Sequence, residues 1–323
     1  MSATSEIGVS IVVEWENALT ADDVRPRCAL AELARQTAAL AERCEVLFLH
    51  NPAQVSRDEI AAVVAPYLRE NRTAWRIEAA PGLHYYDLKN AGARRARGAI
   101  VVFTDSDIVV EPGWLAAITA PFAQAPEITL VAGNTYLDTT TLAGKAMAEG
   151  WIFPPRSNSD ALTTTSFFLA NNVALRRDFL LAHPFPPMPA GATRGACVVL
   201  TRQLHAEGVT IWLASGARAN HPAPKNLKRV LIRALAEGRD WALNGGLTPG
   251  SAALGHGLRY AAKTPRDIAH MIRATRAAGA RIGLTGPQAA LTALLQCAYC
   301  ALRPIGAFAA ILWPAYARQA WRI

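Results

Sequence analysis

Two aspartates lie one residue apart, directly after a strongly apolar stretch of the chain. Asp105 and Asp107 follow the run Ala99–Phe103, which is rich in β-branched residues and predicts a buried strand. Open α/β sheets bind their ligands at the carboxyl ends of such strands. Carboxylate oxygens suit Mg²⁺ or Mn²⁺, which proteins usually hold with a few carboxylates and substrate phosphates. The spacing therefore indicates a divalent-metal site, while a plain turn is the alternative, because Asp and Ser are common turn residues.

The acidic pair belongs to a longer pattern in segment 86–116, made of Lys89-Asn90, Gly92, Ala96, Gly98, Phe103, Asp105-x-Asp107 and Trp114-Leu115. This pattern resembles the central signature of family 2 glycosyltransferases with the GT-A fold, and a looser resemblance covers residues 7–240. In that family the basic residue before the Asn approaches the nucleotide-sugar phosphates, and the acidic pair holds the bridging metal. The resemblance implies that Asn17, Lys89 and Asp105 bind the nucleotide sugar, and that Asp105 and Asp107 hold Mn²⁺ or Mg²⁺.

The chemistry of sugar transfer agrees with that implication. A nucleotide diphosphate gains negative charge as the sugar departs, and a divalent ion with a fixed cation stabilises it. Lys89 is the candidate cation. The alternative is that Lys89 is an exposed charge on a basic helix, beside Arg94, Arg95 and Arg97.

The elements that must position these residues alternate along the chain. Strands are expected at Ile7–Val13, Val46–Leu49, Trp75–Glu78 and up to Asp105, with a helix between each pair. This alternation predicts a parallel, doubly wound nucleotide-binding half. With the resemblance, the expected fold class is α/β, a GT-A type doubly wound mixed sheet. We expect a GT-A domain over 1–240 and a basic, apolar helical extension over 241–323.

Further elements follow Trp114. We expect a helix from there to about Phe122, a strand at Ile128–Gly133 and a helix at Cys197–Glu207. A strand at Thr210–Ala214 and a helix capped by Asn226 that ends at Gly238 come next. His221 follows that last strand. Because several GT-A enzymes supply a third metal ligand from a histidine at this place, the resemblance implies the same role for His221; a surface turn histidine before proline is the alternative.

Three positions depart from the family pattern. Only Asn17 matches the usual turn after the first strand, and His50-Asn51 replaces the acidic residue that usually holds the nucleobase. At the place of the catalytic Glu-Asp pair the chain has Ala196-Cys197. Cys197 is a poor base at neutral pH, because an unperturbed thiol titrates near pH 8.5, so the base is unknown, with Glu149 and Asp160 as unranked candidates.

The cysteines and the distribution of charge limit the compartments and the partners that the protein can have. The five cysteines are scattered, and no secretory signal pattern opens the chain, so a cytoplasmic protein is expected. Residues 218–323 hold 15 Lys/Arg against 3 Asp/Glu, a net of +12; with +8 overall, the first 217 residues carry about −4. Such an excess attracts an anionic partner. Nucleic acid is disfavoured, because no nucleic-acid motif accompanies the charge.

The tail Gly283–Trp313 is almost free of charge, and Arg303-Pro304 divides it into two apolar stretches. It is either a pair of packed helices or a hairpin that dips into one leaflet. Basic flanks favour the inner face of the cytoplasmic membrane, an anionic surface.

The function predicted from these features is a metal-dependent, hexosyltransferase-like glycosyltransferase. It would move a sugar from a nucleotide diphosphate sugar to a membrane-proximal lipid-linked or glycan acceptor, with inversion. The alternative is a catalytically degenerate GT-A-like protein that binds a nucleotide or a lipid carrier, favoured by the missing Glu-Asp pair.

Overall fold

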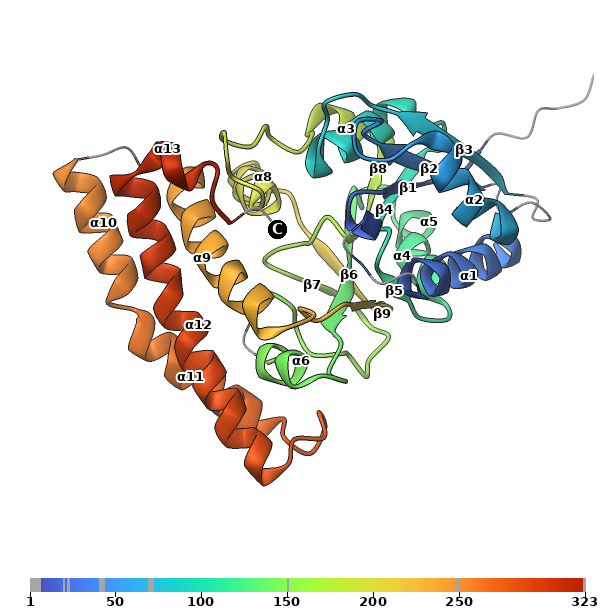
Figure 1. Ribbon diagram of the computed structural model, residues 1–323. Coiled ribbons are helices and arrows are strands. Elements are labelled where there is room, and N and C mark those ends of the chain that lie inside the picture. The colour runs from blue at the N-terminus through green and yellow to red at the C-terminus, as the bar shows by residue number, and fades with distance from the viewer. Residues whose placement is uncertain are drawn as a thin grey trace, which may run out of the picture. The chain divides into compact units, whose positions relative to one another are not determined.

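The computed structural model describes residues 7–19, 21, 24–40, 44–68, 73–149, 151–247 and 250–321. The chain forms two compact units, which alternate along the sequence (Figure 1). Unit 1 comprises Met1–Thr135, Arg156–Pro187 and Leu200–His221, and unit 2 comprises Tyr136–Pro155, Met188–Val199 and Pro222–Ile323. The domain division expected at residue 240 stays a prediction.

Unit 1 is built on a mixed sheet with the strand order β3-β2-β1-β4-β8-β6-β9-β5, in which β7 pairs with β9. The first four strands are parallel, and β8 joins β4 in the antiparallel direction. The strands are β1 Val9–Glu14, β2 Cys44–His50, β3 Ala74–Ala79, β4 Ile100–Asp105, β5 Val109–Val110, β6 Leu130–Leu137, β7 Leu162–Thr164, β8 Asn172–Arg176 and β9 Trp212–His221. The predicted mixed α/β sheet is therefore confirmed.

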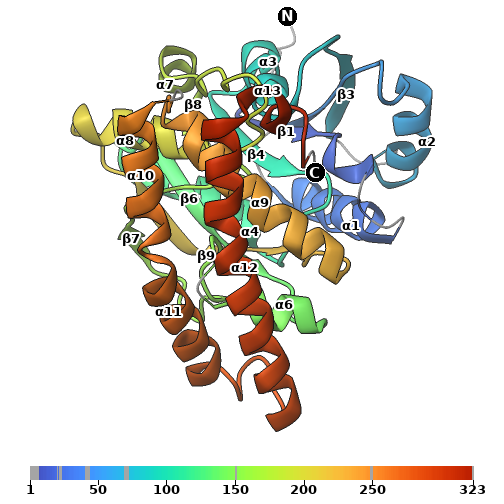
Figure 2. The same ribbon diagram turned by 60° about the vertical axis from the view of Figure 1, so that its left-hand side comes forward.

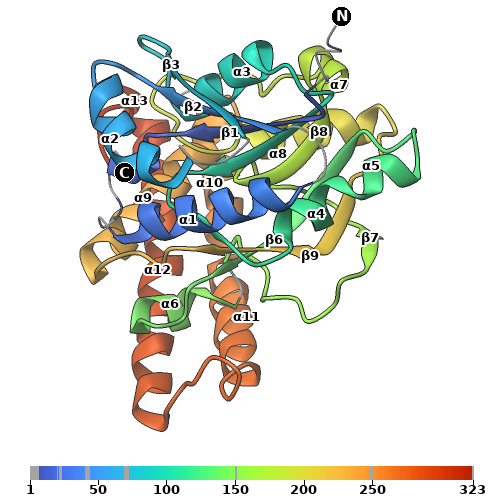
Figure 3. The ribbon, with the colours of Figure 1, turned by 90° about the vertical axis from the view of Figure 1, so that its right-hand side faces the viewer.

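Helices lie on both faces of this sheet, α1 on one and α3 on the other (Figure 3). The helices of this unit are α1 Val24–Ala39, α2 Arg57–Leu68, α3 Tyr85–Arg95, α4 Trp114–Thr119, α5 Pro121–Gln124 and α7 Arg177–Ala182, with a short 3-10 helix at Asn17–Leu19. Helix α8, Ala196–Ala206, begins in unit 2 and continues into unit 1. The predicted single helix after Trp114 is wrong, because Pro121 begins a second helix where its missing N–H costs nothing.

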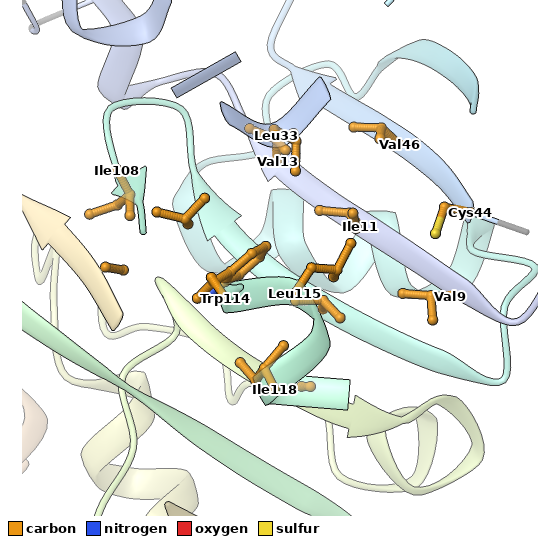
Figure 4. Close-up of a cluster of buried hydrophobic side chains, with 14 of the residues drawn as sticks. Val9, Ile11, Val13, Leu33, Cys44, Val46, Ile108, Trp114, Leu115 and Ile118 are labelled. Atoms are coloured by element: carbon orange, nitrogen blue, oxygen red, sulfur yellow. The ribbon is translucent and has the colours of Figure 1, made fainter. Parts of the chain in front are cut away.

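The main core of unit 1 lies between α1, α4 and the central strands (Figure 4). Ile11, Val46 and Trp114 are fully buried there. Every residue of β1 and β2 is buried, as expected of parallel strands covered on both faces. On the opposite face, a side chain at Gly92 would overlap Val12, so glycine allows α3 to approach the sheet closely. This packing fixes the first turns of α3 beside the end of β4.

Unit 2 is helical over most of its length (Figure 2). Its helices are α6 Leu142–Met147, α9 Leu227–Asn244, α10 Ser251–Ala261, α11 Thr264–Ala277, α12 Gly286–Leu312 and α13 Pro314–Ala317. Asn226 caps α9 by accepting a hydrogen bond from the Arg229 amide at 3.0 Å, as predicted. The helix does not end at Gly238, however, but continues to Asn244.

Two expectations for unit 2 need correction, and both have the same cause. Gly238 does not stop α9, which continues through it. Arg303-Pro304 does not divide the tail either, since α12 is one helix of 27 residues that contains a buried Pro304. A side chain at Gly238 would overlap the Arg303 carbonyl oxygen, and one at Gly306 would overlap the Leu235 carbonyl oxygen. The two glycines therefore let α9 and α12 pack backbone against backbone, and this contact overrides the local helix-breaking signals.

Candidate functional site

The carboxylate of Asp105 is held by three side chains from two other segments. Lys89 Nζ lies 2.6 Å from its Oδ1, the Tyr85 hydroxyl donates at 2.9 Å to Oδ2, and Asn17 Nδ2 donates at 3.0 Å to Oδ2. Asp105 ends β4, Asn17 follows β1, and the other two residues lie in the first turns of α3. The structure thus brings together the three residues predicted to bind the nucleotide sugar, although that role stays a prediction.

Lys89 is not an exposed charge on a basic helix. Its side chain is completely buried, and its ammonium group also lies 4.8 Å from the centre of the Tyr85 ring. A buried ammonium is stable only when it is paired, and Asp105 provides the counter-charge. In this arrangement Lys89 contacts Asp105, and direct contact with a donor phosphate stays a prediction.

Glu14 and Tyr85 belong to this cluster and were missed by sequence reasoning. Glu14 is the register partner of Asp105 in the parallel pair of β1 and β4. It is fully buried, and its Oε2 accepts hydrogen bonds from the amides of Glu16 and Asn17 at 2.8 and 3.3 Å. Burial, followed by the nearby charge of Asp105, raises the pKa of Glu14 well above its usual range, while Lys89 opposes the rise. An acidic residue at the end of an apolar strand was the available signal.

The raised pKa of Glu14 predicts a pH-dependent effect of Glu14→Gln on stability. A carboxyl whose pKa is higher in the folded state than in the unfolded state stabilises the fold at pH values below its unfolded pKa. This stabilisation is lost as the pH rises through the folded-state pKa. Gln keeps the oxygen that accepts from Glu16 and carries no charge. We therefore expect the melting temperature of Glu14→Gln to exceed that of the wild type by more at pH 8 than at pH 4.5. Exposed Glu127→Gln is the control, and an equal difference at both pH values would contradict the pKa direction.

Asp107 lies beside the end of β9. Val109 pairs with Asn220 in the antiparallel contact of β5 and β9. His221 therefore lies one residue beyond the paired segment, at the end of that segment where Asp107 also lies. One guanidinium ties the two segments together, because Arg25 donates to the carbonyl oxygens of Asp107 and Asn220, each at 2.7 Å. The expected strand Thr210–Ala214 is in fact β9, which reaches His221 and carries it to this edge.

These residues fit a divalent cation by their donor chemistry. Asp105 and Asp107 offer carboxylate oxygens and His221 an imidazole nitrogen, a set that Mn²⁺ accepts. Asp105, Asp107 and His221 are therefore the protein ligands we would assign. Among the described residues, no group of three or more His, Cys, Asp or Glu side chains surrounds a common metal position.

The three candidates for the catalytic base have different surroundings. Cys197 is buried in the first turn of α8. Glu149 is buried and pairs with Arg281 at 2.7 Å in unit 2; burial raises its pKa and Arg281 opposes the rise. Asp160 is exposed in unit 1 and pairs with Arg218 at 2.7 Å. The role of each as the base stays a prediction.

A further carboxylate near this segment, Asp240, was missed by sequence reasoning. Its Oδ2 accepts hydrogen bonds from the Thr193 hydroxyl and the Arg194 amide, each at 3.0 Å, directly before α8. It pairs with fully buried Arg239 at 2.8 Å. Burial raises the pKa of Asp240, and the pairing with Arg239 opposes this rise. Asp240 therefore holds the segment that leads into Ala196-Cys197, the place where the catalytic pair was expected. The acidic residue next to an arginine in this basic helix was the available signal.

His50 and Asn51 organise the loops at the end of β2. His50 Nδ1 lies 2.9 Å from the Val55 carbonyl oxygen, so Nδ1 carries the proton in the neutral ring and Nε2 is left as an acceptor. Within the described residues, that buried Nε2 has no hydrogen-bond partner. Asn51 Oδ1 accepts from the amides of Ala53 and Gly82 at 3.1 and 3.3 Å.

Comparison with known proteins agrees with the fold of the sheet. Residues 29–183 match the family described as Glycosyl transferase family 2. The mannosyltransferase PcManGT from Pyrobaculum calidifontis, solved with GDP-Man and Mn²⁺, is similar in structure, with a TM-score of 0.55 and 18% identity over 96% of this chain and 88% of that one. TarS residues 1–349 from S. aureus, solved with UDP-GlcNAc, give a TM-score of 0.52 and 12% identity, covering 94% and 91%.

A third structure, GalNAc-T7 with UDP, GalNAc and Mn²⁺, has a TM-score of 0.47 and 13% identity over 68% of this chain, which spans only 44% of that protein. A search of curated proteins found no match. The fold is that of the GT-A glycosyltransferases. The chain contains a domain of glycosyltransferase family 2, matched over residues 29–183.

Proposed function

We propose that this glycosyltransferase is metal-dependent and transfers a hexosyl group from a nucleotide diphosphate sugar. The observation that carries the proposal is the cluster of buried Asp105 and Lys89 with half-buried Tyr85 and Asn17, and Asp107 lies two residues further on. The cluster lies at the carboxyl ends of β1 and β4, where open α/β sheets bind their ligands. Mn²⁺ and a nucleotide sugar in the similar mannosyltransferase structure support the same assignment.

In this proposal Asp107, His221 and Asp105 would hold Mn²⁺ or Mg²⁺, which neutralises the diphosphate as it leaves. Lys89 fixes the position of Asp105, and Asn17 and Tyr85 orient its two oxygens. A ligand held by three neighbours loses little freedom on binding, so the site is pre-organised. Direct displacement by the acceptor would invert the anomeric centre, and a base such as Glu149 or Asp160 would take the acceptor proton.

The acceptor in this proposal is a lipid-linked or glycan hydroxyl close to a membrane, with the protein at the inner face of the cytoplasmic membrane. The support is the charge distribution. Residues 251–323 hold nine Lys/Arg and a single acidic residue, Asp267, and this excess accompanies the most apolar helix of the chain. Basic residues next to apolar surface favour an anionic bilayer.

The competing function is a protein that binds a nucleotide or a lipid carrier without transfer. Ala196-Cys197 favours it, because an alanine cannot take a proton and the Cys197 thiol is buried. The two functions differ in turnover but not in binding.

A panel of sugar nucleotides separates the two functions. Each donor is incubated with the protein, Mn²⁺ and crude membrane lipid, and nucleotide release is measured. We expect release from at least one donor, and we expect it to stop on chelation and in Asp107→Ala. Donor binding without release across the whole panel would favour the non-catalytic protein.

A further inference from the structure

The outward side of α12 is apolar along its whole length. Residues three or four positions apart form one stripe: Pro287, Leu291, Leu294, Ala298, Ala301, Ile305, Phe308 and Leu312. Leu291, Leu294 and Ile305 are 52%, 68% and 55% exposed. A helix on the surface of a soluble protein normally turns its charged residues outward. Here 27 residues, about 40 Å of helix, present no charge to solvent along this stripe.

The opposite side of α12 carries its polar groups and faces the interior of unit 2. Arg303 pairs there with Glu237 at 2.9 Å and with Asp267 at 3.1 Å. Gln296 is fully buried and donates to the Ala146 carbonyl oxygen and the Thr275 hydroxyl. Although α12 is the one described helix long and apolar enough to cross a membrane, half of its most apolar stretch is buried in the protein. This arrangement suits a helix that lies along a bilayer surface better than one that crosses it.

Neighbouring elements extend the apolar stripe and add charge beside it. Trp313 and Tyr316, 63% and 59% exposed, follow the stripe at its carboxyl end, and such aromatic residues favour the boundary between lipid and water. Helix α10 packs on α12, with Gly257 against Phe308, and its Leu258 is 63% exposed. Helices α10 and α11 lie beside α12 (Figure 2), and α11 has exposed arginines at 266, 273 and 276.

We propose that the α12 stripe, with Leu258, Trp313 and Tyr316, docks unit 2 onto an anionic lipid bilayer without spanning it. Charge selects this occupant. A second copy of the chain would bring the same excess of nine cations over one carboxylate against its like, which repels. An anionic leaflet attracts those cations and accepts the apolar stripe at the same time. This docking surface depends on the proposed function in one respect only, namely that the acceptor lies close to a membrane.

The test is binding of the full-length protein to vesicles, without any sugar nucleotide. We expect binding to phosphatidylcholine vesicles that contain phosphatidylglycerol, and weaker binding to pure phosphatidylcholine. Leu291→Gln/Leu294→Gln should bind at least about tenfold more weakly to both, because two large apolar side chains no longer enter the lipid. Arg273→Gln/Arg276→Gln should weaken binding to the anionic vesicles alone, by about tenfold. Leu181→Gln, at an exposed leucine of α7 in unit 1, is the matched control and should bind like the wild type.

Three results would overturn the docking surface. They are no binding of the wild type to anionic vesicles, undiminished binding of Leu291→Gln/Leu294→Gln, and a dimer that these two changes dissociate in the absence of lipid. Circular dichroism of each variant checks that the fold is kept. Because no transfer is measured, a protein that binds vesicles but turns over no donor would leave the surface standing while the proposed function fails.

Discussion

Asp107→Ala is expected to abolish the Mn²⁺-dependent part of nucleotide-sugar binding and to lower transfer at least about a hundredfold, since a metal ion supplies several kcal/mol of charge stabilisation. Asp107 lies in the loop between β4 and β5, and circular dichroism of Asp107→Ala checks that the fold is kept. Calorimetry with and without Mn²⁺ measures the loss. Exposed Asp87→Ala, on α3, is the matched control. Undiminished affinity in Asp107→Ala would contradict the metal-site assignment.

Asp105→Ala tests a different property of the same site. It would leave the fully buried ammonium of Lys89 without its counter-charge, and breaking a buried pair costs about 3–5 kcal/mol. A loss of activity there would report on stability as well as on the metal.

Gly306→Leu is expected to separate α9 from α12 and to destabilise unit 2 by about 3 kcal/mol or more. Even the first side-chain carbon would overlap the Leu235 carbonyl oxygen, and backbone cannot move aside as a flexible side chain can. Overpacking of a close core contact typically costs 1–3 kcal/mol, and here two long helices must shift together. Urea unfolding followed by circular dichroism measures the change.

The control for this prediction is Gly255→Ala on α10. A side chain there meets only the far end of Arg259, at 3.8 Å, so removing a helical glycine should stabilise the protein slightly. If Gly306→Leu unfolds at the same denaturant concentration as the wild type, the close packing of α9 on α12 is wrong.

Local pattern was sufficient to predict the parallel half of the sheet. The apolar runs that became β1, β2 and β4 are buried on both faces, and such strands can be recognised without knowledge of their neighbours. The position of Asp105 at the carboxyl end of β4 follows from the same run. The resemblance around Lys89 added the fold family, which the sheet order and the similar structures confirm.

Tertiary structure decided what those residues contact. Lys89 lies 16 residues from Asp105, and Asn17 lies 88 residues from it, so no local period could pair them. Glu14 enters the site only because β1 and β4 are neighbours in one register. Likewise, α9 continues past Gly238 and α12 past Pro304 because the two helices pack together. The sequence by itself thus determined the strands and helices whose apolar residues follow a regular pattern along the chain. The ion pairs, the buried carboxylates and the helix ends depended instead on long-range contacts, which local periodicity does not encode.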